Sequence, residues 1–149
     1  MSLDLLKTQL DLLEKQLFWL DYSYSQINNV DLTQELSIES INHYENLCSR
    51  FARTIDFLIR KVFRTIDACE FEHQGTLIDV VNNAHKRKLF TSMDLIRNIK
   101  DLRNEIVHEY IEEDLIALFA EAKTLTAELI IIVQNTLVYG NNLLNTTGG

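Results

Sequence analysis

The 149-residue chain contains no proline and only four glycines, two of which are its last two residues. Proline and glycine are the residues that most disfavour the interior of a helix. Their scarcity therefore predicts long helices joined by short connections. A chain of this length can bury a substantial hydrophobic core as one domain, so we expect a single domain over residues 1–149.

Cysteines and long apolar runs are also scarce. Cys48 and Cys69 are the two cysteines, and on the one helix predicted below they would lie about 30 Å apart, too far for a disulfide. Unbridged thiols are typical of a reducing compartment. The longest aliphatic run, Leu129 to Val133, is too short to span a bilayer, and no secretory signal pattern opens the chain. We expect a cytoplasmic protein with no membrane contact, no metal and no cofactor.

Basic residues are outnumbered, since 14 lysines and arginines against 22 acids give a net charge of −8. Such a total argues against a nucleic-acid partner. The charge is uneven, however, at −6 over residues 1–49, +4 over 50–103 and −6 over 104–149. Local charge decides whether a phosphate backbone can approach, so the central third keeps a nucleic-acid function open.

Apolar residues recur at spacings of three and four, as in amphipathic helices. The predicted helices cover about residues 2–29, 33–70, 76–88, 92–110 and 115–139, with 140–149 as a frayed tail. Gly75 is expected to cap the end of one helix and Ser92 the start of another. The predicted fold is all-α, an antiparallel up-and-down bundle of four long helices plus a short extra helix.

A row of cations lies on the 33–70 helix, away from its apolar stripe, and two more lie on the 92–110 helix. This row is either an ordinary solvated face or a track for phosphates. Its members, the candidate RNA-binding residues, are Arg50, Arg53, Arg60, Lys61, Arg64, Arg97 and Lys100.

The segment Arg103–Tyr110 combines an arginine, an asparagine, a histidine and a tyrosine near a helix end. Arg103 interrupts an apolar row, which is costly unless the guanidinium is paired or opens onto a polar cleft. Asn104 is one turn from His108 and could orient its ring. On an ideal helix Arg103 and His108 point about 140° apart, so two copies of the chain would be needed to aim both at one target.

Each of these residues also has an ordinary explanation. Arg103 could pair with an acid such as Glu45 or Glu105. His108 could simply favour a helix C-terminus, and Tyr110 could be a core tyrosine with its hydroxyl at the rim.

The pattern R-N-x-x-x-H followed by a tyrosine two residues later, in an all-helical chain of this length, resembles the HEPN superfamily. The extended form, from Arg103-Asn104 to His108-Glu109-Tyr110, is similar to HepT-type toxins of HEPN/MNT toxin–antitoxin modules. The resemblance implies a metal-independent ribonuclease that acts as a homodimer. It further implies Arg103 and His108 as the catalytic pair, Asn104 in support, and Tyr110 as the tyrosine that a partner nucleotidyltransferase adenylylates to switch off the nuclease.

The chemistry of these residue types fits that implication, because histidine can exchange a proton near neutral pH and arginine can bind phosphate oxygens. We therefore expect a type VII-like toxin that cleaves cellular RNA (tRNA or mRNA) and is neutralised by a cognate MNT-type nucleotidyltransferase antitoxin. One alternative is a non-catalytic helical binding partner of a nucleotidyltransferase. Another is a structural dimerisation domain in which Arg103 is merely a paired arginine.

Overall fold

The structure, a computed structural model, describes residues 2–72, 75–108 and 115–147. Over these residues the chain forms five helices and no strand. They are α1 (Ser2–Gln26), a long helix built from α2 (Ile38–Phe57), η1 (Leu58–Val62) and α3 (Phe63–Cys69), then α4 (Leu77–Lys86), α5 (Met93–Val107) and α6 (Leu115–Thr147). The all-α class predicted from the sequence is confirmed.

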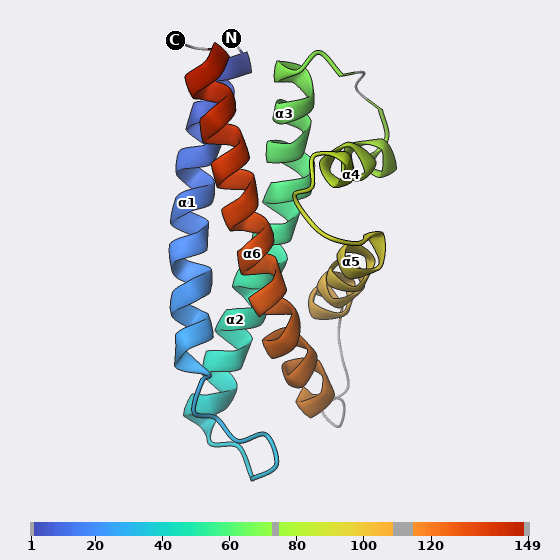
Figure 1. The fold of residues 1–149 in the computed structure, drawn as a ribbon. Helices are drawn as coiled ribbons and strands as arrows, with labels where there is room; N and C mark the ends of the chain where they lie inside the picture. The colour runs from blue at the N-terminus through green and yellow to red at the C-terminus, as the bar shows by residue number, and fades with distance from the viewer. Residues whose placement is uncertain (1, 73–74, 109–114, 148–149) are drawn as a thin grey trace.

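The helices alternate in direction, as the sequence predicted for an up-and-down bundle (Figure 1). In that view α1 descends, the α2–α3 helix ascends, α5 descends and α6 ascends to end beside the N-terminus. The short helix α4 lies next to α3, above α5. The fourth side of the bundle is therefore shared by α4 and α5, and each packs against a different part of the long α2–α3 helix.

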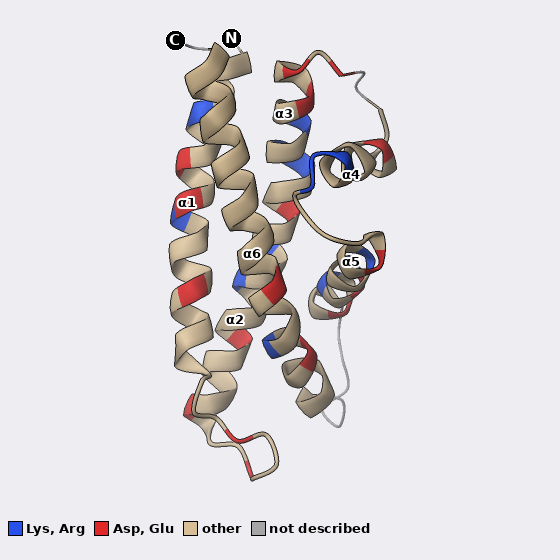
Figure 2. Cartoon of the chain, viewed as in Figure 1, with Lys and Arg blue, Asp and Glu red and all other residues tan. Residues whose placement is uncertain are grey.

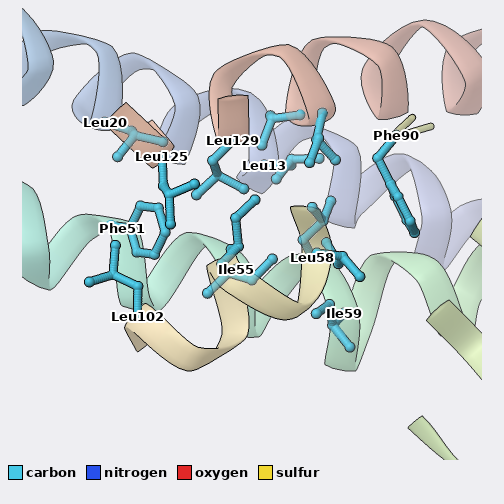
Figure 3. Close-up of a cluster of buried hydrophobic side chains, with 14 of the residues drawn as sticks. Leu13, Leu20, Phe51, Ile55, Leu58, Ile59, Phe90, Leu102, Leu125 and Leu129 are labelled. Carbon is cyan, nitrogen blue, oxygen red and sulfur yellow. The ribbon is translucent and has the colours of Figure 1, made fainter. Parts of the chain in front are cut away.

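The core consists of aliphatic and aromatic side chains directed inward from α1, α2, α5 and α6 (Figure 3). Leu20, Phe51, Leu102 and Leu129 have no exposed surface. Full burial of such side chains contributes roughly 1.5–3 kcal/mol each. This layer holds α5 against α2 and so fixes the position of the segment that begins at Arg103.

The long helix contains one π turn, η1, in which the backbone N–H of Phe63 bonds to the carbonyl of Leu58, five residues earlier. The sequence predicted an uninterrupted α-helix here. Apolar spacings of three and four do not reveal a single wide turn, because both halves of the helix keep their own periodicity.

Two helices end in a Schellman motif whose left-handed residue is not glycine. Phe71 (φ 59°) follows α3, and Lys88 (φ 63°) follows α4. After α3, the N–H of Glu72 bonds to the carbonyl of Asp67 at 2.8 Å, and the N–H of Phe71 to that of Ala68 at 3.2 Å, as the motif requires. The prediction that Gly75 caps this helix is wrong.

Gly75 has another role, at the start of α4. Thr76 and Asp79 form a capping box, each side chain accepting a bond from the other's backbone N–H. A Cβ at Gly75 would collide with the Asp79 carboxylate, so the small residue leaves space for the cap.

Helix α6 continues to Thr147, so the prediction of a frayed tail from residue 140 is wrong for residues 140–147. Gly140 is buried, and a Cβ there would come within 2.7 Å of Leu10 Cδ1 on α1. The glycine thus permits close packing of the two helices where the sequence suggested a break. No helix among the described residues has the length and apolar character needed to cross a membrane.

Candidate functional site

Helix α5 carries the first half of the Arg103–Tyr110 segment. The Ser92 side chain caps it by accepting a bond from the Leu95 N–H at 3.1 Å, as predicted. Buried Ile96, Ile99 and Leu102 set its rotation about its axis. Arg103 is consequently placed at the edge of the interface with α2.

The helix ends at Val107, about one turn beyond Arg103, whereas the sequence predicted an end at about residue 110. His108 is the C-cap residue, and its extended backbone (φ −92°, ψ 156°) leaves the helical path while its N–H still bonds to the Asn104 carbonyl at 3.2 Å. The side chain of His108 is exposed. The ideal-helix angle between Arg103 and His108 therefore does not apply. Tyr110 lies outside the described residues.

Arg103 forms a two-pronged ion pair with Asp56 of α2. Its Nε lies 2.9 Å from Asp56 Oδ1, and its Nη2 lies 2.9 Å from Oδ2. The alternative that Arg103 pairs with an acid is confirmed, but the acid is Asp56 and not Glu45 or Glu105, the two examples named from the sequence. The side chains are 28% and 35% exposed, so the pair is at the rim of the core, where a bidentate contact fixes geometry more than it adds stability.

Asn104 contacts Arg103 and not the histidine ring in the described structure. Its Oδ1 accepts a bond from Arg103 Nη1 at 3.3 Å. A guanidinium has five N–H donors, and Asp56 and Asn104 engage three of them. The other two donors have no partner among the described residues and could bind an anion such as a phosphate oxygen.

Two depressions meet at Asp56. The first, which we call the Arg103 pocket, has a volume of about 50 Å³ and is lined by Ile55, Asp56, Ile59, Arg60, Leu77, Lys100, Arg103 and Asn104. The second, the α2–α5 groove, has a volume of about 480 Å³ and is lined by Glu45, Cys48, Ser49, Ala52, Arg53, Asp56, Ile106 and Val107. We call the two together the recess beside the C-terminal end of α5. Its cations gather in the Arg103 pocket, whereas the α2–α5 groove is lined by Arg53 and by two acids, Glu45 and Asp56.

The predicted cations do not all share this recess. Arg60 and Lys100 line the Arg103 pocket, and Arg53 lines the α2–α5 groove. The others are directed elsewhere: Arg50 bonds to Ser23, Arg64 to the Gly75 carbonyl and Arg97 to Asp94, whereas Lys61 is exposed on η1.

The far side of α5 has the opposite charge. Burial, together with the nearby carboxylates of Glu105 and Asp101, raises the pKa of Glu121 on α6. Carboxylates this close to one another repel a phosphate. An anionic ligand at α5 is therefore favoured on the α2 side, where Arg103 lies.

Cys48 lines the α2–α5 groove, but burial, and secondarily the charge of Glu45, raises its pKa to about 12. A thiol with such a pKa stays protonated at neutral pH and is a poor nucleophile. The cationic chemistry of the recess is therefore that of arginine and lysine, and His108 is not among the described residues that line either depression.

Sequence reasoning missed two features of this region. Asp56 lies between Arg53 and Arg60 at spacings of three and four, so it could have been recognised as the acid on the cationic row. Arg87, within the basic run His85–Lys88 at the end of α4, has a side chain only 9% exposed and pairs with Asp67 at 2.6 Å and Glu70 at 2.7 Å.

Tyr139 completes the network around Arg87, because its hydroxyl donates to Glu70 Oε1 at 2.6 Å. Burial lowers the pKa of Arg87, but hydrogen bonds and charge from the two carboxylates outweigh it and raise the pKa overall. Figure 2 shows the basic segments of α3 and of the turn after α4 side by side with acidic ones. This part of the basic third is used to join α3, α4 and α6.

Comparisons of the chain with models of protein families, with curated proteins and with solved structures found no match.

Proposed function

We propose that the chain is a metal-independent endoribonuclease that acts as a toxin in the cytoplasm. The observation that supports this most is the setting of Arg103. Asp56 fixes its guanidinium in a pocket that also contains Arg60 and Lys100. Two of its N–H donors have no partner in the part of the chain that the structure describes, and an exposed histidine follows five residues later. A structural arginine would need the ion pair but not the surrounding cations.

The reaction that these residues would perform is attack of a ribose 2′-hydroxyl on the adjacent phosphorus. The 2′-oxygen loses a proton and bonds to phosphorus, the bond from phosphorus to the 5′-oxygen breaks, and the 5′-oxygen gains a proton. His108 would transfer a proton in this sequence. Arg103 would stabilise the negative charge that builds on the non-bridging oxygens.

The proposal includes a homodimer. Within one chain, Arg103 faces α2 through its contact with Asp56, whereas His108 leaves the helix at the C-cap. A second copy related by a two-fold axis would bring the histidine of one chain to the arginine of the other. The exposed Val107, with 49% of its surface accessible, lies between these residues and offers apolar area for such a contact.

The proposed control is adenylylation of Tyr110 by a cognate MNT-type nucleotidyltransferase antitoxin. Tyr110 follows His108 by two residues in the sequence, so AMP on its hydroxyl would add bulk and negative charge next to a phosphate-binding site. Incubation with the partner and ATP should add the mass of AMP. Retention of the added mass in Tyr110→Phe would contradict the acceptor assignment.

The nuclease proposal is tested by RNA cleavage with purified Arg103→Ala and His108→Ala. Loss of a general acid or base typically costs a factor of 10²–10⁴ in rate, so each variant should be at least about 100-fold slower. His43→Ala is the matched control, because His43 is near a helix start and pairs with Glu39. Circular dichroism should show equal helix content in all four proteins.

The second candidate function is a non-catalytic binding partner of a nucleotidyltransferase. The bidentate Arg103–Asp56 pair gives it some support, since a purely structural arginine would show the same contact. It predicts equal (or no) cleavage by all variants, and no growth inhibition when the chain is expressed without the partner.

A further inference from the structure

A third depression lies on the other side of Arg53, between α1 and α2. This α1–α2 pocket has a volume of about 370 Å³. Its lining residues are Leu12, Lys15, Gln16, Trp19, Arg50, Arg53, Thr54 and Phe57. None of the residues predicted to be catalytic lines this pocket, although two of its lining residues, Arg50 and Arg53, were predicted to bind RNA.

The pocket is cationic in an acidic protein. Three of its lining residues, Lys15, Arg50 and Arg53, carry a positive charge, and none of the described residues that line it is acidic. The whole chain has a net charge of −8. Such a local reversal of charge attracts an anion.

The pocket also offers aromatic surface that its neighbours hold in place. Trp19 is 49% exposed, and the guanidinium carbon of Arg50 lies 4.9 Å from its ring centroid. Arg50 is itself fixed by a 2.6 Å bond to Ser23 Oγ. Phe18 contacts the indole edge-on, with ring centroids 5.2 Å apart. The indole is thus ordered before any ligand arrives, and Phe57 provides a second ring in the lining.

Gln16 adds a hydrogen-bonding group. Its Oε1 is buried and has no hydrogen-bond partner among the described residues. An unpaired buried acceptor is unfavourable, and a ligand N–H could satisfy it. Nucleobases carry amino and imino N–H groups at their edges.

The pocket adjoins the candidate active site. Arg53 lines both the α1–α2 pocket and the α2–α5 groove, and Asp56 lines both that groove and the Arg103 pocket. The three depressions therefore follow one another around α2, a helix whose diameter with side chains is about 10–12 Å. A short length of single strand could reach from Arg103 to Trp19.

We infer that the α1–α2 pocket binds one nucleotide of a single-stranded RNA whose cleaved phosphate lies at Arg103. The base packs against Trp19 and Phe57 with an N–H directed at Gln16, and Lys15 and Arg53 contact the backbone phosphate. Stacking on aromatic side chains combined with cations along the backbone is the usual means of holding single strands. This inference rests on the proposed nuclease function and extends it, because it names unpaired RNA as the substrate of that nuclease.

The test uses the full chain and a short single-stranded oligoribonucleotide with 2′-O-methyl groups, which lack the attacking hydroxyl and so stay uncut. Trp19 is the single tryptophan, and its fluorescence reports on the pocket directly. We expect saturable quenching as the strand is added. By anisotropy of a labelled strand, Trp19→Leu should weaken binding about 5- to 150-fold, the range expected for loss of one base stack.

Lys15→Gln and Arg53→Gln should each weaken binding and reduce its salt dependence. Lys7→Gln is the matched control, because Lys7 is an exposed lysine on the same helix, outside the pocket, and it should bind like the parent. With cleavable RNA, the Trp19→Leu variant should show a raised KM and an unchanged kcat. Circular dichroism and urea unfolding confirm that each variant folds.

The outcomes separate this inference from the nuclease proposal. Binding and cleavage that leave Trp19 fluorescence unchanged, with Trp19→Leu like the parent, would overturn the inference and leave the nuclease intact. Quenching without any cleavage of unmodified RNA would support the pocket and contradict the nuclease. If AMP quenches as tightly as the strand, the site serves free nucleotides and not RNA. If Trp19 fluorescence changes with the concentration of the protein and not with that of the added strand, the pocket is an interface between copies of the chain, and the inference is overturned.

Discussion

At the scale of single residues, the position of Arg103 depends on one acid. The sequence showed that this arginine interrupts an apolar row and therefore needs a partner or a cleft. It did not show which acid, because Asp56 is 47 residues away and meets Arg103 only when α5 packs against α2. Predicting the pair required knowing the rotation of both helices, which the buried residues of the core determine together.

Asp56→Asn is expected to lower kcat about 10- to 100-fold, because misplacement of a catalytic group by about 1 Å can cost a factor of 100. KM for RNA should stay equal or fall, since a negative charge is removed from the site. Stability should change by less than about 1 kcal/mol, as both side chains are partly exposed. The matched control is Asp94→Asn, which breaks the exposed pair with Arg97. Unchanged kcat in Asp56→Asn would contradict a positioning role.

Cys48 gives a prediction about alkaline pH. Burial, with a smaller contribution from Glu45, raises its pKa from 9.0 to about 12, so the folded chain retains a proton that the unfolded chain loses above pH 9. The free energy of unfolding should therefore be unaffected by this group below pH 9 and should fall between pH 9 and 12, by at most about 1.4 kcal/mol per pH unit. Urea unfolding at several pH values measures the slope.

Cys48→Ala should give a shallower decline over that range, after allowance for its lower stability at pH 7. Tyr44 and Tyr139 also have a raised pKa, chiefly because of burial, so some decline remains. Cys69→Ala is the comparison: burial also raises the pKa of its half-buried thiol, but the pKa of the more deeply buried Cys48 reaches about 12, so Cys48→Ala should flatten the decline more. Equal slopes for the parent and Cys48→Ala would show that the thiol is accessible in the folded state.

At the scale of helices, the sequence predicted their number, order and approximate bounds, because apolar spacing reports directly on which face is buried. It predicted their ends less well. Gly75 was expected to take the left-handed position after α3, but Phe71 takes it. The sequence contains no sign of this choice, since the hydrogen bonds that impose it form between backbone groups alone.

Phe71→Gly should therefore stabilise the protein by about 0.5–1 kcal/mol. A left-handed conformation costs an L-residue roughly 1–2 kcal/mol that glycine does not incur, part of which is offset by the greater freedom of glycine in the unfolded chain. The phenyl ring is 95% exposed, so little buried surface is lost. Phe71→Ala keeps the strain and should show no gain. Equal midpoints of urea unfolding for the two variants would contradict this account.

At the scale of the whole molecule, the basic third of the sequence does not form one surface. Arg87 joins α3 to α6 through Glu70 and Tyr139. Arg50 bonds to Ser23 and so links α2 to α1. Arg53, Arg60 and Lys100 instead line the recess beside Arg103. The linear charge profile could not separate these roles, because it ignores which face of a helix each cation occupies. It did indicate correctly that the cations are unevenly placed.

Mixed dimers test whether the site is complete in one chain. If each active site takes Arg103 from one chain and His108 from the other, inactive Arg103→Ala and inactive His108→Ala should regain activity when they are denatured together and refolded. A random mixture holds about half hybrid dimers, each with one intact site, so recovery should approach a quarter of the parent rate. No recovery, with hybrids verified by mass, would place both residues of a site in the same chain.

The π turn at Leu58–Val62 gives the long helix one residue more than a regular helix would need. In an unbroken α-helix, removing one residue turns everything beyond it by about 100° and so directs buried side chains away from the core. In this chain the π turn already contains one extra residue, so a deletion there leaves a regular helix and causes no such rotation. Loss of exposed Arg60 would convert the wide turn into an ordinary one and leave α2 facing α5 and α3 facing α4. The middle of the α2–α3 helix is thus a place where this chain can tolerate a change in length.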